Sequence, residues 1–288
     1  MPGDEQLTLS AWDALDDDAR RDCAEGVGER LPDGWTLTGL ERFSLGDASH
    51  HIAMFKHLAS KSAFALIPAG AVTLGWDRAP LDLSAETQEA LVTAFEEAWG
   101  GGESLEDVID DVITPSRTVT LTPFLLEVSP KPATDYLAED IYDYEEPEGD
   151  DGPDDIYRAE IARVLATDGF RLPTSDEWEH ACRAGSSSFF RWGSEWPPGD
   201  PLATDFESYK QANGFGLRFT SSPYQVECVE GDCFRDGDGG SSVCGGDPEP
   251  YVWHTLASAY AYPMERAEEC LPETYEEAQV RRLFPLPD

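Results

Sequence analysis

The stretch RLPTSDEWEHACRAG, residues 171–185, decides the fold because it marks a junction between a strand and a helix. Pro173 lacks the N–H group that a strand ladder needs, so an extended segment should end there. Thr174 or Ser175 can cap the next helix while Glu177 reaches back to the cap, as in a capping box. That helix should bury the apolar side chains of Trp178 and Ala181. Arg183 lies in its last turn, where a cation is favoured. Each position therefore has a possible scaffold role.

The composition is that of a chain able to bury a substantial core. It has 288 residues, 40% of them hydrophobic, with 8 Trp and 13 Phe, which suits one large domain or two smaller ones. No apolar run reaches the length of about 18 residues that a membrane span requires. The acidic N-terminus lacks the basic-then-apolar order of a secretory signal, so we expect a soluble, cytoplasmic protein.

The formal charge of −38 limits the partners of the protein. Such a surface repels phosphates and anionic lipid, which argues against nucleic acid and membranes. A protein or a small-molecule ligand remains as a partner. The acidity itself has a general explanation, a host with a salty interior or a genome rich in G and C. More specific explanations are cation binding and recognition of a basic partner.

The periodicity of the remaining chain predicts short, mixed elements. Helices are expected where apolar residues recur at helical spacing, and strands where β-branched and apolar residues alternate. The predicted helices cover 10–31, 50–60, 84–113 with a break at the glycines 100–102, 156–169 and 175–185. The predicted strands lie within 62–77 and 117–123. An acidic loop separates 130 from 155, and the chain after 185 is expected to be irregular.

The signature stretch continues into RWG at residues 191–193, and together they resemble a family motif. RLPT-x-x-EWE-x-A-x-RAG is similar to the signature of the formylglycine-generating, sulfatase-modifying-factor family. Weaker likenesses follow in the same order, namely FALIPAGAVTLGWD at 64–77, RTVTLTPFLLEVSP at 117–130, NGFGL at 213–217, GGSSVC at 239–244 and VRRLFPL at 280–286. The resemblance implies an α+β fold, a variant of the C-type lectin fold with short strands, few helices and much irregular structure. It places the family domain at 62–288 and leaves 1–61 as a helical extension packed on it.

The same resemblance indicates which chemistry to expect. Formylglycine-generating enzymes oxidise a substrate cysteine with molecular oxygen, using Cu(I) held by two thiolates. Cys244 matches the first thiolate, but the second position is Glu249, and a hard carboxylate is a poor ligand for Cu(I). The expected GNVWEW segment is replaced by RFTSSPYQVEC at 218–228, and the residue before GGS is Asp238 instead of a basic residue. Conventional activity is therefore not expected, although Cys244 stays the catalytic candidate.

Other side chains offer metal-binding alternatives. Cys228 and Cys233 have the five-residue spacing of the family pair. A Cys228/Cys233 or a Cys233/Cys244 pair could hold a soft metal or form a disulfide, or the residues could be buried or spare thiols. Asp236 and Asp238 alternate with glycines, as in part of a calcium loop or in a solvated turn. Calcium is thus a candidate cofactor, with copper a second candidate.

The histidines suggest a further comparison. A sister branch of the superfamily, the sulfoxide synthases of ergothioneine biosynthesis, binds non-haem iron through three histidines. Here His50, His51 and His57 precede the family domain on the predicted helix 50–60, although 1–61 is too short for the whole helical bundle of that branch. His180 is expected on the outer side of the signature helix, facing solvent.

The aromatic residues near the C-terminus complete the candidate sites. They either anchor a bound partner or fill a core poor in strands, and these two interpretations stay open for Tyr251, Trp253, His254, Tyr260 and Tyr262. Our prediction is a divergent family member that uses its scaffold to bind a ligand or a protein. The alternative is a copper- or iron-dependent oxidoreductase acting on a cysteine-containing or small thiol substrate. A third possibility is an accessory subunit that associates through the acidic loop.

Overall fold

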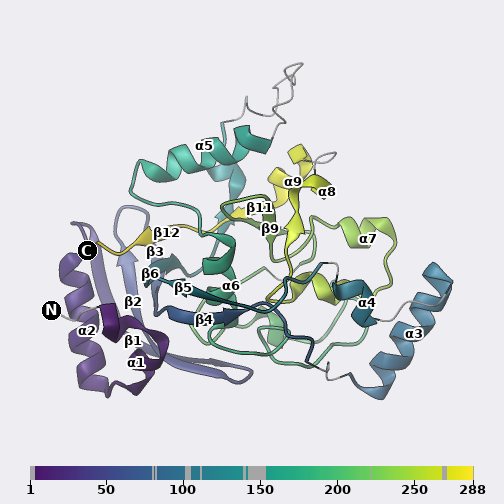
Figure 1. Ribbon diagram of the computed structural model, residues 1–288. Helices are drawn as coiled ribbons and strands as arrows, with labels where there is room; N and C mark the ends of the chain where they lie inside the picture. Colours follow the sequence, from purple (N-terminus) through teal and green to yellow (C-terminus); the bar gives the residue numbers. More distant parts are fainter. Residues whose placement is uncertain are drawn as a thin grey trace.

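The computed structural model describes residues 4–79, 81, 83–100, 105–110, 112–138, 141, 154–220, 222–267 and 271–287 (Figure 1). Within these ranges the strands form three sheets, with helices and irregular segments around them. Nearly all strand pairs are antiparallel, and β8 with β11 is a parallel pair. This is the α+β class that the sequence predicts. In the described part of the chain, no helix is long and apolar enough to cross a membrane.

The first sheet joins the two ends of the chain. Its strand order is β1-β2-β3-β6-β12, all antiparallel. The strands are β1 Trp35–Leu45, β2 Ala48–His57, β3 Ser62–Ile67, β6 Phe124–Glu127 and β12 Leu283–Pro285. Two N-terminal helices, α1 Leu9–Ala14 and α2 Asp17–Arg30, confirm the predicted helical segment 10–31 and lie beside β1 and β2 (Figure 1).

The predicted helix at 50–60 is wrong, because these residues form most of β2. Ile52 and Met54 face one hydrophobic cluster, whereas Ala53 and Phe55 face another. A strand that is buried on both faces shows no apolar–polar alternation, so the helical spacing of its apolar residues was misleading. The expected domain boundary after residue 61 falls in the turn between β2 and β3, which pair with each other.

The second sheet and a two-stranded ribbon hold the centre and the C-terminal half. The second sheet has the order β10-β9-β8-β11-β7, and the ribbon pairs β4 with β5. The strands are β4 Gly70–Leu74, β5 Arg117–Leu121, β7 Lys131–Pro132, β8 Val226–Cys228, β9 Cys233–Arg235, β10 Tyr262–Pro263 and β11 Ala278–Val280. The predicted strands around residue 70 and at 117–121 are therefore confirmed.

The remaining helices surround these sheets. They are α3 Ala85–Trp99, α4 Leu105–Asp110, α5 Asp154–Ala166, α6 Ser175–Arg183, α7 Ser241–Gly245, α8 Met264–Ala267 and α9 Leu271–Glu277. Short 3-10 turns are η1 Asp4–Leu7, η2 Ala133–Asp135, η4 Ser208–Lys210 and η5 Val252–Leu256. The helices predicted at 84–113, 156–169 and from Ser175 are confirmed. Of the acidic loop, residues 139–140 and 142–153 lie outside the described ones.

Helix α6 lies near the centre of the molecule (Figure 1), and it starts where the sequence predicts. The Thr174 hydroxyl accepts the N–H of Glu177 at 3.2 Å, and the Glu177 carboxylate accepts the N–H of Thr174 at 2.8 Å. The guanidinium of Arg171 donates hydrogen bonds to both oxygens of that carboxylate, at 2.7 and 2.6 Å. The capping box is confirmed, and it fixes the angle between the RLPT segment and the helix.

The end of α6 is closed by the NGFGL turn. Ala184 adopts a left-handed conformation with φ of 48°, which ends the helix. The side-chain amide of Asn213 donates to the carbonyl groups of Ala181 and Cys182, at 2.7 and 2.9 Å. These carbonyls lie in the last turn, where no intrahelical donor is available to them. The NGFGL motif therefore caps the helix that the RLPTSDEWEHACRAG motif forms.

Buried ion pairs connect α6 and the first sheet to the C-terminal strand. The Trp178 indole donates to Glu227 at 2.9 Å, and Glu227 pairs with Arg281 at 2.5 Å. Glu127, at the end of β6, pairs with Arg282 at 2.6 Å. All of these side chains are nearly or fully buried. The VRRLFPL segment thus supplies the two cations that neutralise carboxylates of the core.

Candidate functional site

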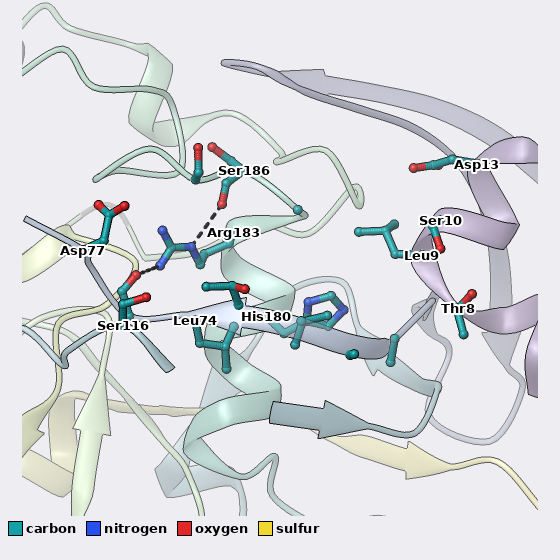
Figure 2. A pocket seen from close by; sticks show the side chains of 17 residues that line it. Thr8, Leu9, Ser10, Asp13, Leu74, Asp77, Ser116, His180, Arg183 and Ser186 are labelled. Atoms are coloured by element: carbon teal, nitrogen blue, oxygen red, sulfur yellow. Dashed lines mark hydrogen bonds between the residues drawn. The ribbon is translucent and has the colours of Figure 1, made fainter. Parts of the chain in front are cut away.

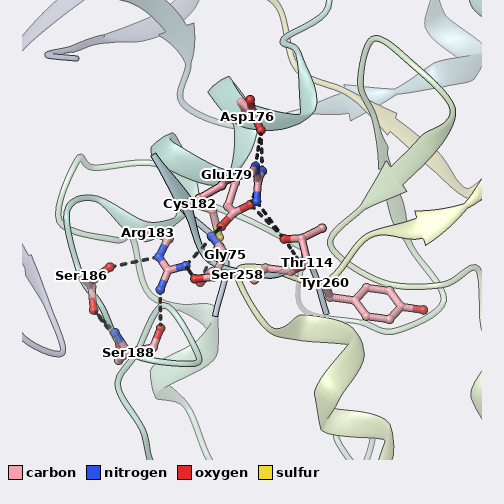
Figure 3. A network of polar contacts seen from close by, with 12 residues as sticks. Gly75, Thr114, Asp176, Glu179, Cys182, Arg183, Ser186, Ser188, Ser258 and Tyr260 are labelled. Atoms are coloured by element: carbon pink, nitrogen blue, oxygen red, sulfur yellow. Dashed lines mark hydrogen bonds and ion pairs between the residues drawn. The ribbon is translucent and has the colours of Figure 1, made fainter. Parts of the chain in front are cut away.

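Glu179 of α6 lies at the centre of a buried polar network (Figure 3). Its side chain is fully buried and pairs with Arg117 at 3.0 Å and with Arg183 and Arg235 at 3.2 Å each. It also accepts the N–H of Gly75 at 2.5 Å. Gly75 has φ of 78°, and a Cβ there would lie 2.0 Å from the Pro115 carbonyl oxygen, so this close approach requires glycine.

Arg183 ties the same network to the loop that follows α6. Its guanidinium donates to the Gly75 carbonyl and, at 3.1 Å, to the Ser186 carbonyl. A further contact reaches the Ser188 carbonyl at 3.4 Å. Because these carbonyls and Glu179 engage the guanidinium, Arg183 is a positioning cation and not an anion-binding group. It holds the 185–188 loop at a fixed distance from β4.

A cavity of about 670 Å³ opens beside this network (Figure 2). One wall is the N-terminal segment from Thr8 to Ser10 with Asp13 of α1. The second is formed by β4 and its flanking residues, namely Ala69 and residues 71–75, and the third is the start of the loop after α6, residues 185–187. Three segments far apart in the sequence thus enclose it, and its volume is in the range of small-ligand sites.

The lining of the cavity combines apolar side chains with hydroxyls and carboxylates. Within the described residues, the side chains of Ser10, Ser116 and Ser187 have no hydrogen-bond partner, so they are available to a ligand. The Nε2 atom of His180 lies 2.7 Å from the Pro68 carbonyl oxygen, and burial lowers the pKa of this imidazole, which stays neutral near pH 7. The lining therefore suits a ligand with an apolar part and a donor or cationic group.

The two carboxylates of the cavity differ in their surroundings. Asp13 lies 2.9 Å from Nδ1 of His50, whose Nε2 atom is 2.8 Å from the Ala184 carbonyl oxygen. Burial alone would lower the pKa of His50, but these hydrogen bonds and the Asp13 charge outweigh it and raise the pKa. The charge of Asp13 is thus partly compensated. Asp77 has no cationic partner among the described residues and accepts the N–H of Ala79 at 3.1 Å.

The structure separates the thiols that the sequence brought together. Cys228 lies opposite Phe234 in the β8–β9 ladder, so these two side chains share a face and Cys233, next to Phe234, points to the other face. Accordingly, Cys228 belongs to one hydrophobic cluster and Cys233 packs against the second. Both are free thiols, so the disulfide alternative is not realised and the pair cannot close on one metal ion.

Cys244 is an exposed thiol on the short helix α7. Its Sγ atom lies 3.9 Å from the hydroxyl of Tyr224. Burial raises the pKa of Cys182 and of Cys228 to about 12, which leaves both as protonated core residues. Cys270 lies outside the described residues.

The aspartates of the RDGDGGS run serve the protein itself. Asp236 is buried, pairs with Arg191 at 3.1 Å and accepts the N–H of Thr220. Burial raises its pKa to about 7. Asp238, also buried, accepts the N–H groups of Gly240 and Ser242, at 3.0 and 2.8 Å. The expectation of a solvated turn is wrong, and the oxygens that calcium would need already accept hydrogen bonds.

The C-terminal aromatic residues lie in the core. Tyr251, Trp253, His254 and Tyr260 are between 0% and 4% exposed, and Tyr262 is 5% exposed. His254 stacks on Tyr251 with ring centroids 4.1 Å apart, and burial lowers its pKa to about 4. Of the two interpretations left open by the sequence, core filling matches this burial. Rings with so little exposed surface are not available to anchor a bound partner.

The histidines do not assemble into an iron site. His50 and His51 are neighbours on β2 and point to opposite faces of the strand, and Nδ1 of His57 lies 3.0 Å from the Ser60 hydroxyl. His180, expected at the surface, is 2% exposed. In the part of the chain that the structure describes, no three His, Cys, Asp or Glu side chains are grouped as metal ligands would be.

Sequence reasoning missed the residues that build the cavity. The EWE motif alone does not indicate the role of Glu179, although a carboxylate four residues before Arg183 on one helix face is a detectable signal of an ion pair. No pattern along the sequence indicates the cavity, because its lining residues Leu9, Ala71 and Ser187 are far apart in the chain and come together only in the fold.

Comparison with known proteins leaves the family of this chain unassigned. No family model and no curated protein matches the sequence. A solved structure, Treponema denticola variable protein 1, is similar over 86% of this chain and 99% of that chain, with 11% identity and a TM-score of 0.38. A similarity at this level assigns neither a fold family nor a function.

Proposed function

We propose that this chain is a divergent relative of the formylglycine-generating family that uses its C-type-lectin-like scaffold to bind a ligand. The observation that carries the proposal is the cavity between α1, β4 and the loop after α6. The buried Glu179 network holds two of its walls, at Gly75 and, through Arg183, at the loop after α6, and walls fixed in this way reduce the ordering cost of binding. The proposed family relationship is supported by the sequence motifs alone, and helix α6 starts with the capping box that those motifs predict.

The positions of the thiols favour binding over copper-dependent oxidation. Linear coordination of Cu(I) needs two thiolates that converge, and soft ligands are what that ion selects. Cys244 is exposed beside Tyr224, whereas Cys228 and Cys182 are deep in the core. For the reduced protein we expect no difference in Cu(I) affinity between wild type and Cys244→Ser. Tight binding that disappears in the variant would instead support the oxidoreductase alternative.

The binding proposal is tested with benzylamine, a probe that combines an apolar ring with a cationic group. Saturation-transfer NMR is expected to detect binding to the wild type. Ser187→Trp places a large side chain in the cavity and should abolish the signal, because Ser187 is exposed there and has no partner to lose. Glu41→Trp, on the exposed surface of β1, is the matched control and should keep it. No signal from the wild type, or an undiminished signal from Ser187→Trp, would contradict the proposal.

A further inference from the structure

The cavity has a feature that points to the class of its ligand, an open edge of strand β4. β4 pairs with β5 from Gly70 to Leu74, and no other strand of the described chain extends along its second edge. In an antiparallel ladder, the N–H and C=O groups of successive residues point alternately to the two edges. Every second residue of β4 therefore directs its main-chain groups away from β5.

Contacts at both ends of the strand show which residues these are. Ahead of β4, the N–H of Ala69 donates to the Leu7 carbonyl at 3.0 Å, and its carbonyl accepts the N–H of Leu9 at 2.9 Å. After β4, the N–H and carbonyl of Gly75 bind Glu179 and Arg183. All of these partners lie on the edge away from β5, so this edge carries the main-chain groups of the odd-numbered residues.

Ala71 and Thr73, between these two ends, direct their main-chain groups into the cavity. Both residues line it, both have exposed side chains, and neither has a main-chain hydrogen-bond partner on this edge within the described residues. An edge with unpaired donors and acceptors is a template for another strand. The parallel bridge between Thr8 and Ala69 already uses this edge, but the chain then turns away into α1.

The charge around the edge indicates what kind of strand fits. Asp77 lies three residues after the end of β4 and has no cationic partner among the described residues. Asp13 lies on the opposite side of the cavity (Figure 2). The whole chain carries a formal charge of −38, which attracts cations to its surface. A basic side chain next to the added strand would meet Asp77, and apolar side chains would meet Leu9 and Val72 of the lining.

We propose that the ligand is an extended peptide with a basic residue, which adds to β4 as a strand and pairs with Ala71 and Thr73. This inference rests on the proposed binding function and specifies it. Such recognition takes its affinity from main-chain hydrogen bonds and its specificity from alternate side chains. At about 3.4 Å per residue, a segment of about four residues covers the edge between the Thr8 contact and the Gly75 contact.

The first experiment uses the wild-type protein and a capped pentapeptide, acetyl-Val-Lys-Val-Arg-Val-amide. Two N-methylated forms are compared, one modified at the second and fourth residues and one at the first, third and fifth. In an added strand only one set of N–H groups faces β4, so one form should lose binding in calorimetry and the other should keep it. Hydrogen exchange of the Ala71 and Thr73 amides should slow in the complex. Equal affinity of the two forms would overturn strand addition.

Variants locate the peptide on β4. Thr73→Pro removes an N–H that has no partner in the protein and should weaken binding about tenfold or more, whereas Thr73→Val keeps the N–H and should bind normally. Asp77→Asn should weaken binding about two- to fivefold, as for an exposed ion pair, and Glu41→Gln should have no effect. Unchanged affinity in both Thr73→Pro and Asp77→Asn would place the peptide elsewhere and overturn the inference.

The benzylamine experiment separates failure of this inference from failure of the binding function. If benzylamine binds in the cavity and the peptide does not, the cavity is a ligand site but strand addition is wrong. If neither binds, both proposals fail. Self-association of the protein through β4, detected by a concentration-dependent mass in light scattering and combined with no peptide binding, would also overturn the inference.

Discussion

Replacing Glu179 by glutamine removes a negative charge that three arginines share inside the protein. Arg117, Arg183 and Arg235 lie 3.0 to 3.2 Å from its carboxylate, and the side chain is fully buried. Breaking a buried ion pair by removing one partner costs about 3–5 kcal/mol, because a buried charge is left uncompensated. The glutamine oxygen still accepts one hydrogen bond, which recovers about 1 kcal/mol. We therefore expect Glu179→Gln to lower the free energy of unfolding by about 2–4 kcal/mol.

The assay is urea unfolding followed by tryptophan fluorescence, with thermal unfolding as a second measurement. At about 2–4 °C per kcal/mol for a domain of this size, the midpoint should fall by about 5–15 °C. Asp176→Asn is the matched control, since Asp176 pairs with the same Arg117 at 2.5 Å but its side chain is 36% exposed. An exposed pair contributes at most about 1 kcal/mol. If Glu179→Gln lowers the free energy of unfolding no more than Asp176→Asn does, burial of the network does not stabilise the fold.

Three further predictions concern pH, thiols and salt. Burial lowers the pKa of His254 to about 4, so stability present above about pH 6.5 should be lost as the pH falls toward 4, by up to about 3 kcal/mol. His254→Asn should flatten that part of the pH profile in urea unfolding, and an unchanged slope would contradict the assignment. Iodoacetamide should label exposed Cys244 rapidly and Cys228 and Cys182 only after unfolding, as peptide mass spectrometry would show; fast labelling of Cys228 would argue against its buried position. With a formal charge of −38, the negative side chains repel one another in the folded protein, and salt screens this repulsion. The midpoint of unfolding should therefore rise as the Debye length shrinks from about 10 Å at 0.1 M salt to about 3 Å at 1 M. A falling midpoint would show that attractive surface ion pairs dominate instead.

The local signals of the sequence predicted the elements whose causes are local. The capping box of Thr174 and Glu177 gave the start of α6, and alternating β-branched residues gave β5. A local pattern failed at β2, where Ile52 and Phe55 are at helical spacing but belong to a strand buried on both faces. The prediction that His180 faces solvent was also wrong, because Pro68 and its neighbours cover that side of α6.

The sequence by itself determined the α+β class and the helix of the signature. These follow from hydrogen-bonding and packing rules that act over a few residues. The tertiary structure decided the site. Cys228 and Cys233 are separated because adjacent strand positions face opposite ways, and Asp236 is paired with Arg191, 45 residues away. The open edge of β4 likewise exists only because β5 covers one side and α1 turns away from the other, which no pattern along the chain encodes.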